Sequence, residues 1–127
     1  MNIQQVVDNK KKYMDMLLMA DPEEQMIEKY LDEGEMFILK EYGEVKTVCV
    51  VMLLKNRKCE LKNIATREED QGKGYGKNMI LFLCEHYSSQ CDTMYVGTGN
   101  CQKTLDFYKK CGFVNSHIIV DFFVKNY

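Results

Sequence analysis

Three glycines at alternate positions, Gly72, Gly74 and Gly76, stand between a segment of alternating polarity and a segment with helical periodicity. Glycine adopts positive φ without a steric penalty and lets a ligand approach the main chain closely. The first amides of a helix lack internal acceptors, and the helix dipole favours negative charge beside them. The spacing therefore predicts a turn that binds a pyrophosphate at a helix start, and Lys73 and Lys77 add positive charge to it.

Two other phosphate-binding motifs fit this turn poorly. A Walker loop needs Gly-Lys followed by Ser or Thr, whereas Lys73 is followed by Gly74 and Lys77 by Asn78. A dinucleotide fingerprint needs Gly-x-Gly-x-x-Gly early in a parallel unit, whereas this turn reads Gly-x-Gly-x-Gly after three expected antiparallel strands. A flexible turn with incidental glycines is the plain structural alternative, and a nucleotide phosphate site is another.

The elements before this turn begin with two expected helices. Residues 8–18 carry apolar side chains on one face and predict the first helix. Asp21, Pro22 and the acidic residues that follow predict a second helix over residues 22–32, with Asp21 as its N-cap and Gly34 as its end.

Strand signals follow the helices. Residues 35–40 and 44–54 are rich in Val, Ile, Leu and Phe, and residues 41–43 between them indicate a hairpin turn. A second polar turn at residues 56–58 leads into residues 60–66, which alternate apolar and polar side chains as a half-buried strand does. We therefore expect three antiparallel strands before the glycine turn.

Helices and strands alternate after the turn. The patterns predict a helix over residues 78–88, a strand over 93–97, a helix over 102–111 that ends at Gly112, and a strand over 117–124. A chain of 127 residues suits one compact domain, which we place at residues 1–127. The expected fold class is mixed α/β with a mainly antiparallel central sheet.

Composition excludes several classes of function. A hydrophobic fraction of 46% and a charged fraction of 28% are those of an ordinary soluble domain. A net charge of -2 gives no electrostatic basis for binding nucleic acid. No apolar run approaches the ~20 residues that span a bilayer, and the N-terminus lacks the pattern of a signal peptide. We therefore expect a cytoplasmic protein that binds neither nucleic acid nor membranes.

The six cysteines, at positions 49, 59, 84, 91, 101 and 111, are not spaced as metal ligands. They form no Cys-x-x-Cys pair, and His86 and His117 lie far apart, whereas zinc sites need closely paired ligands. We therefore expect no metal and, in a chain that is not exported, reduced thiols. Cys49 and Cys84 lie in apolar runs and are expected in the core.

Two segments together resemble a known family. The stretch that contains Gln71-Gly72-Lys73-Gly74-Tyr75-Gly76 is similar to the coenzyme-A-binding segment of the GNAT acetyltransferases, whose core is Arg/Gln-x-x-Gly-x-Gly/Ala. Tyr108-Lys109-Lys110-Cys111-Gly112-Phe113 resembles the second family signature, Tyr-x-x-x-Gly-Phe, one helix and one strand later. The resemblance implies a GNAT-like fold with helices on both faces of the sheet. It also implies transfer of an acetyl group from acetyl-CoA to an amine, without a metal.

The resemblance assigns the coenzyme contacts. Main-chain groups of the strand before the turn are expected to pair with the pantetheine arm, in a slot opened by divergence from the strand over residues 93–97. The turn over residues 71–77 is expected to hold the pyrophosphate through its amides. The residues assigned to the coenzyme are Ile64, Ala65, Thr66, Gln71, Gly72, Lys73, Gly74, Tyr75, Gly76, Lys77 and Asn100.

The resemblance also suggests catalytic groups. Tyr108 stands where many relatives keep a tyrosine near the thioester sulfur, which implies a general acid; packing on the inner face of its helix is the alternative. Glu60 is the candidate base, acting through water, or else an exposed carboxylate at a strand end. The Ile64 amide would stabilise the oxyanion. Relatives often place an asparagine where this chain has Cys101, so Asn100 either contacts the coenzyme or caps the following helix.

Two features leave the acceptor and the assembly open. Acidic residues at 21, 23, 24, 28, 32, 33 and 35 would suit a cationic small-molecule amine, or else form a solvated face. A peptide or protein amine and a non-catalytic acyl-CoA-binding or interaction module are the other candidates. Relatives build two strands after the segment that matches Gly112-Phe113, whereas residues 114–127 predict one, so the last strand is expected to be missing. The chain is then truncated, is completed by another chain, or has an apolar edge that favours a homodimer.

Overall fold

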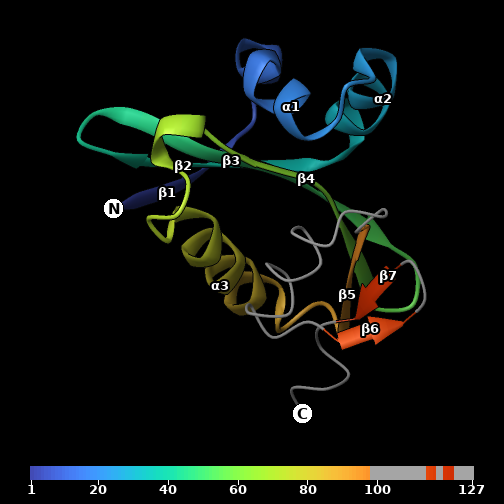
Figure 1. The fold of residues 1–127 in the computed structure, drawn as a ribbon. Coiled ribbons are helices and arrows are strands. Elements are labelled where there is room, and N and C mark those ends of the chain that lie inside the picture. The colour runs from blue at the N-terminus through green and yellow to red at the C-terminus, as the bar shows by residue number, and fades with distance from the viewer. Residues whose placement is uncertain (98–113, 117–118, 122–127) are drawn as a thin grey trace.

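The computed structural model describes residues 1–97, 114–116 and 119–121. These residues form one sheet of seven strands in the order β1-β2-β3-β4-β5-β7-β6. Helices α1 and α2 cover one face of the sheet and α3 covers the other (Figure 1). The neighbouring strands are antiparallel except for the parallel pair β4 and β5. The predicted mixed fold, with a mainly antiparallel sheet and helices on both faces, is confirmed.

The elements have the following bounds. In chain order they are β1 Asn2–Val6, the 3-10 helix η1 Lys10–Tyr13, α1 Met14–Ala20, α2 Glu24–Glu33, β2 Glu35–Glu41, β3 Glu44–Leu54, β4 Lys58–Thr66, the 3-10 helix η2 Glu68–Asp70, α3 Tyr75–Tyr87, β5 Thr93–Gly97, β6 Val114–Ser116 and β7 Ile119–Asp121. None of the helices in the described residues is long and apolar enough to span a bilayer. The helix expected over residues 102–111, with Gly112 as its end, lies outside the described residues.

The predicted hairpin between β2 and β3 is confirmed, and its turn explains the sequence. Tyr42 and Gly43 both have positive φ, 56° and 75°, in a two-residue connection. That combination matches a type I′ turn, whose twist suits antiparallel strands. The residues just before β4 and β5 are also linked. The Asp92 amide donates to the Arg57 carbonyl at 2.7 Å, and the Asp92 carboxylate accepts from Arg57 Nε at 3.1 Å, which fixes the start of β5 beside that of β4.

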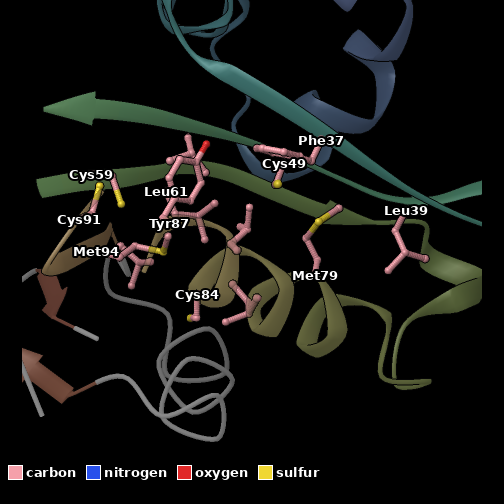
Figure 2. Close-up of a cluster of buried hydrophobic side chains, with 14 of the residues drawn as sticks. Phe37, Leu39, Cys49, Cys59, Leu61, Met79, Cys84, Tyr87, Cys91 and Met94 are labelled. Atoms are coloured by element: carbon pink, nitrogen blue, oxygen red, sulfur yellow. The ribbon is translucent and has the colours of Figure 1, made fainter. Parts of the chain in front are cut away.

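Two apolar layers stabilise the sheet, one on each face. The layer under α3, shown in Figure 2, includes Phe37, Cys49, Leu61 and Cys84, so the expectation that Cys49 and Cys84 belong to the core is confirmed. The layer under α1 and α2 contains the following buried residues: Met16, Leu17, Ile27, Tyr30, Leu31, Met36, Ile38, Val48, Val50 and Ala65. Burial of such apolar area is the main favourable term in folding.

A β-bulge in β4 reverses which side chains of the strand face the α3 layer and which face the layer under α1 and α2. Val50 pairs with Asn63 but the next residue, Val51, pairs with Leu61, so Lys62 is an extra residue on β4. Leu61 therefore packs under α3, whereas Asn63 and Ala65 lie on the side of α1 and α2. Lys62 lies four residues before Thr66, the last residue of β4, so the bulge is close to the glycine turn.

The helices do not begin where the sequence predicts: α1 and α2 begin later and α3 begins earlier. Residues 8–18 were expected as one helix, but η1 precedes α1, which starts at Met14. Asp21 is not the N-cap of α2: the cap position is Glu23, and the Asp21 carboxylate accepts the Glu23 amide at 3.1 Å. This bond spans two residues, so it forms a local turn before the helix rather than a cap within it. The helix after the glycine turn starts at Tyr75, earlier than the expected residue 78.

The two ends of the sheet also differ from the expectation. Strand β1 was not predicted, because its sequence is mostly polar; it is an edge strand that pairs with β2. The strand expected over residues 117–124 is found in its described part as β7, but the expectation of a single strand after Phe113 is wrong, because β6 precedes β7 and β7 lies between β5 and β6. Three-residue strands are too short to show an alternating pattern. The argument for a homodimer from a missing last strand therefore no longer holds.

Candidate active site

The glycine turn connects the end of β4 to the start of α3. Gly72 and Gly74 have φ of 80° and 90°, a conformation that favours glycine. A Cβ at Gly72 would meet nothing within 4 Å, and one at Gly74 would meet only Asn78 Nδ2 at 4.0 Å. The space over both residues is therefore open, and the backbone angle rather than crowding within the protein requires glycine there.

Main-chain donors are concentrated where the turn becomes α3. The first internal bond of this helix runs from the Asn78 amide to the Gly74 carbonyl at 3.0 Å. The amides of residues 75–77 precede that bond and lack an acceptor within the helix. With the positive end of the helix dipole, they suit a negatively charged ligand such as a pyrophosphate.

Gln71 closes the turn onto β4. Its side-chain Nε2 donates to the Thr66 carbonyl at 3.2 Å, and its amide donates to the Glu68 carbonyl at 3.3 Å. The side chain of Gln71 therefore holds the turn against the strand. Because its amide is engaged as well, Gln71 shapes the turn, and the amides that follow it are the ones left for a ligand.

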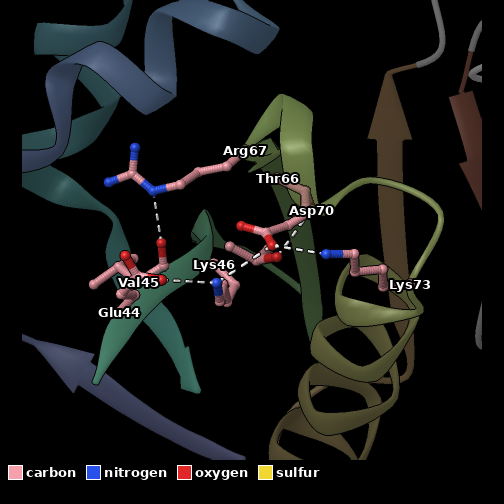
Figure 3. A network of polar contacts seen from close by, with 8 residues as sticks. Glu44, Val45, Lys46, Thr66, Arg67, Asp70 and Lys73 are labelled. Atoms are coloured by element: carbon pink, nitrogen blue, oxygen red, sulfur yellow. Dashed lines mark hydrogen bonds and ion pairs between the residues drawn. The ribbon is translucent and has the colours of Figure 1, made fainter. Parts of the chain in front are cut away.

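The buried carboxylate of Asp70 forms ion pairs with two lysines beside the turn (Figure 3). Its side chain is 4% exposed, and its Oδ1 accepts from Lys46 Nζ at 3.3 Å and from Lys73 Nζ at 3.4 Å. Lys46 also contacts Glu44 at 3.1 Å, and this hydrogen bond is the main cause that raises the pKa of Lys46. The positive charge expected from Lys73 is thus partly neutralised by Asp70, while Lys77 is exposed.

Arg67 ties the same region to the β2–β3 hairpin. Its Nε donates to the Val45 carbonyl at 2.8 Å, and its amide donates to the Lys46 carbonyl at 3.1 Å (Figure 3). Sequence reasoning missed Arg67 and Lys46 as supports of the turn. Lys46 and Asp70 are 24 residues apart, and no local pattern relates them.

Directly before the turn, one edge of β4 has no partner strand among the described residues. Its pairing with β5 runs from Lys58 with Thr93 to Leu61 with Val96. In the part of the chain that the structure describes, residues 63–66 of β4, which follow the bulge, pair with β3 alone. Their other edge presents main-chain donors and acceptors of the kind that bind an extended chain of amides.

The predicted coenzyme residues before Asn100 lie together along this edge and turn. Ile64, Ala65 and Thr66 are on the part of β4 beyond its pairing with β5, and residues 71–77 follow η2 as the glycine turn and the first residues of α3. The side chain of Tyr75 points into the core, where a hydrogen bond with the Glu41 carboxylate is the main cause that raises its pKa. Only the amide of Tyr75 can therefore serve a ligand at the turn.

The predicted catalytic residues are only partly placed. Glu60 lies on β4, next to the end of its pairing with β5, and its Oε1 contacts Lys62 Nζ at 3.1 Å. The Glu60 side chain is 28% exposed, so water can reach its carboxylate. Tyr108 and Asn100 lie outside the described residues. No group of three or more His, Cys, Asp or Glu within the described ranges is placed to hold a metal ion.

Comparison with known proteins identifies the family. A family model described as the acetyltransferase (GNAT) domain matches residues 32–115. The chain belongs to the GNAT acetyltransferases. It is 36% identical over 115 residues to the uncharacterised N-acetyltransferase YvbK of Bacillus subtilis (strain 168), a match that covers 89% of this chain and 74% of that protein. The chain is therefore an acyltransferase.

Solved structures of GNAT acetyltransferases have the same fold as this chain. A Bacillus subtilis acetyltransferase in complex with CoA has a TM-score of 0.82 at 27% identity, over 94% of this chain and 95% of that one. A GNAT family acetyltransferase from Elizabethkingia anophelis with acetyl-CoA bound has a TM-score of 0.85 at 28% identity, over 91% and 76% of the two chains. The cosubstrate is acetyl-CoA, and the turn with its open space, its amides and the unpaired edge of β4 fits such a group.

Proposed function

We propose that this chain transfers the acetyl group of acetyl-CoA to a primary amine of a small molecule. The observation that carries the proposal is the continuity of the unpaired edge of β4 with a turn of positive-φ glycines at the start of α3. An extended amide-containing arm and a pyrophosphate need these two surfaces in this order. We take residues 1–127 as one acetyltransferase domain and place the reaction in the cytoplasm.

The binding groups are main-chain atoms. In this proposal Ile64, Ala65 and Thr66 pair with the pantetheine arm, and the amides of residues 72–77, with Lys73 and Lys77 nearby, hold the pyrophosphate, while Gln71 holds the turn against β4. Bound acetyl-CoA supplies an acetyl group that a thioester has activated. Hydrogen bonds to main-chain atoms fix the position of the arm without requiring particular side chains.

Proton transfer completes the chemistry. An amine attacks a thioester only as the neutral base, so a proton must first leave the ammonium group of the acceptor. We assign this step to Glu60 acting through water, which the partial exposure of its carboxylate supports. The Ile64 amide is assigned to stabilise the oxyanion and Tyr108 to donate a proton to the departing thiolate. The assignments of Tyr108, and of Asn100 as a coenzyme contact, rest on the sequence.

The acceptor is expected on the side of α1 and α2. Leu61 packs under α3, so its neighbour Glu60 on β4 faces the opposite side, where these helices lie. Exposed acidic side chains on α2 and just before it, such as Glu23, Glu24 and Glu28, would attract a cationic amine. This charge supports a small cationic acceptor over a neutral one.

A direct test is turnover with a panel of amines. The full chain would be incubated with acetyl-CoA and polyamines, aminoglycosides, amino acids or short peptides, with release of free thiol as the readout. We expect turnover with at least one cationic small molecule and a loss of about 10²–10⁴-fold in kcat for Glu60→Gln, the range for a general base. Turnover of peptides alone would refute the small-molecule class, and an unchanged kcat in Glu60→Gln would refute the assigned base.

A further inference from the structure

A buried chain of hydrogen bonds joins β4 to the connection between α1 and α2. Asn63 Nδ2 donates to the Tyr30 hydroxyl at 3.0 Å, and the Tyr30 hydroxyl donates to Asp21 Oδ2 at 3.1 Å. The same Asn63 nitrogen donates to the Leu17 carbonyl in α1 at 3.0 Å. One side chain of β4 thus contacts both helices that cover this face.

The direction of these bonds is fixed by chemistry. Burial is the main cause that raises the pKa of Tyr30 to about 12, so its phenol keeps its proton at neutral pH. An ionised carboxylate only accepts and an amide nitrogen only donates. The order from β4 outward is therefore Asn63 to Tyr30 to Asp21, and Asp21 also accepts the Glu23 amide at 3.1 Å.

The chain of bonds fixes the connection at both of its ends. The Leu17 carbonyl, near the end of α1, accepts from the Asp21 amide at 3.1 Å as well as from Asn63. Asp21, at the other end, holds both Tyr30 and the amide that precedes α2. Residues 21–23 between the helices are thus fixed relative to a single residue of β4.

Asn63 lies on β4 directly after the bulge, close to the proposed site. The bulge at Lys62 turns Asn63 toward the helices, at the point where β4 no longer pairs with β5. Asn63 is 4% exposed, and its Oδ1 is buried without a partner in the described residues. An unpaired buried amide oxygen destabilises a fold, so an apolar residue would serve stability better at this position. A polar side chain that satisfies only some of its bonds here indicates a role other than stability.

We propose that Asn63, Tyr30 and Asp21 position the α1–α2 connection as one wall of the acceptor site, and so set the affinity for the acceptor amine. This inference rests on the proposed function, because it needs an acceptor that reaches β4 from the side of α1 and α2. The three side chains are positioning residues: they act through the connection, residues 21–23, and require no contact with the reacting atoms.

Tyr30→Phe tests the inference because it removes the bridging hydroxyl and keeps the ring. The chain offers a matched control in Tyr87→Phe, which removes a buried hydroxyl that donates to Glu35 Oε1 at 2.5 Å under α3, on the other face. Each change deletes one phenol–carboxylate bond, and Tyr30→Phe also removes the acceptor of one Asn63 bond, so we expect a loss of thermal stability in both variants that is somewhat larger in Tyr30→Phe. Asp21→Ala, at a less buried residue, breaks the same chain of bonds should Tyr30→Phe fold poorly.

The kinetic readout separates positioning from stability. For Tyr30→Phe and Asp21→Ala we expect the acceptor KM to rise by about tenfold, the ratio that 1.4 kcal/mol produces. The acetyl-CoA KM should stay within twofold of wild type, and Tyr87→Phe should change neither KM. An unchanged acceptor KM in Tyr30→Phe, or equal changes of both KM values in all variants, would overturn the inference.

A second readout needs no acceptor and separates this inference from the proposed function. Amide hydrogen exchange at Asp21 and Glu23 reports how firmly the connection is held. We expect exchange there to accelerate by about tenfold in Tyr30→Phe and to stay unchanged in Tyr87→Phe. If the wild type binds acetyl-CoA but acetylates no amine, the proposed function fails while this readout still decides whether the network holds the connection. Equal exchange rates at Asp21 and Glu23 in Tyr30→Phe and Tyr87→Phe would overturn the inference that the network holds the connection.

Discussion

Replacing Gly72 with alanine tests whether the glycine turn holds the coenzyme, and the chain supplies a control with almost the same geometry. Gly72 has φ of 80° and Gly43, in the β2–β3 hairpin, has φ of 75°. A Cβ would meet nothing within 4 Å at either position. Neither Gly72→Ala nor Gly43→Ala therefore creates a clash, and both strain the backbone by placing a residue with a Cβ at a positive φ.

The expected loss of stability follows from that strain. A left-handed conformation costs a residue with a Cβ roughly 1–2 kcal/mol. For a domain of this size, this lowers the Tm by about 3–10 °C. We expect the two alanine variants to unfold at similar temperatures, both below the wild type.

The two variants should differ in coenzyme affinity. The Cβ at Gly72 fills the open space over the turn, where the pyrophosphate is proposed to lie, whereas the Cβ at Gly43 lies in a different turn. We expect the Kd for acetyl-CoA to rise by about tenfold or more in Gly72→Ala, a loss of 1.4 kcal/mol. In Gly43→Ala it should stay within twofold. Calorimetric titration at a temperature well below both Tm values measures this, and equal affinities in the two variants would refute the assigned role of the turn.

Three further predictions concern the supports of the site. Lys10 Nζ donates to the carbonyls of Leu31 at 2.9 Å and Gly34 at 2.8 Å at the end of α2, so Lys10→Met should lower the free energy of unfolding in urea by about 1–2 kcal/mol. Asp70→Asn removes a negative charge beside the turn and should tighten acetyl-CoA binding about two- to fivefold at low salt; weaker binding by the folded variant would contradict this. The pKa of Tyr30 is raised from 10.0 to about 12, so its contribution to stability is present below pH 10 and is lost as the pH rises toward 12. Urea titrations over that range should show a falling free energy of unfolding, and the fall should be shallower in Tyr30→Phe.

Local patterns predicted the part of the site that depends on local geometry. The alternation over residues 60–66 gave a strand, and Gly72 and Gly74 indicated a turn with positive φ, which both residues have. The two signatures around Gly74 and Tyr108 indicated the family, because each requires particular residue types at fixed spacing. These inferences needed no knowledge of which segments meet in space.

The rest of the site and of its supports depends on contacts between residues far apart in the sequence, which no local pattern records. Asn63 is 46 residues from Leu17 and 33 from Tyr30, so its partners could not be read from the sequence. The bulge at Lys62 reverses the alternation that would place Asn63 on the other face. Asp21 has the residue type of a helix cap, yet its carboxylate serves Glu23 and Tyr30. Tertiary contacts decided each of these positions.

The most direct test of acetyl-CoA binding is a thermal shift of the full chain with acetyl-CoA, CoA and ATP in parallel. A ligand present at 100 times its Kd stabilises the folded state by about 2.7 kcal/mol, which is a shift of several degrees. We expect acetyl-CoA and CoA to raise the Tm by comparable amounts, and ATP at the same concentration to leave it unchanged. A shift with ATP alone, or no shift with either coenzyme, would contradict the central claim that the glycine turn and the edge of β4 hold acetyl-CoA.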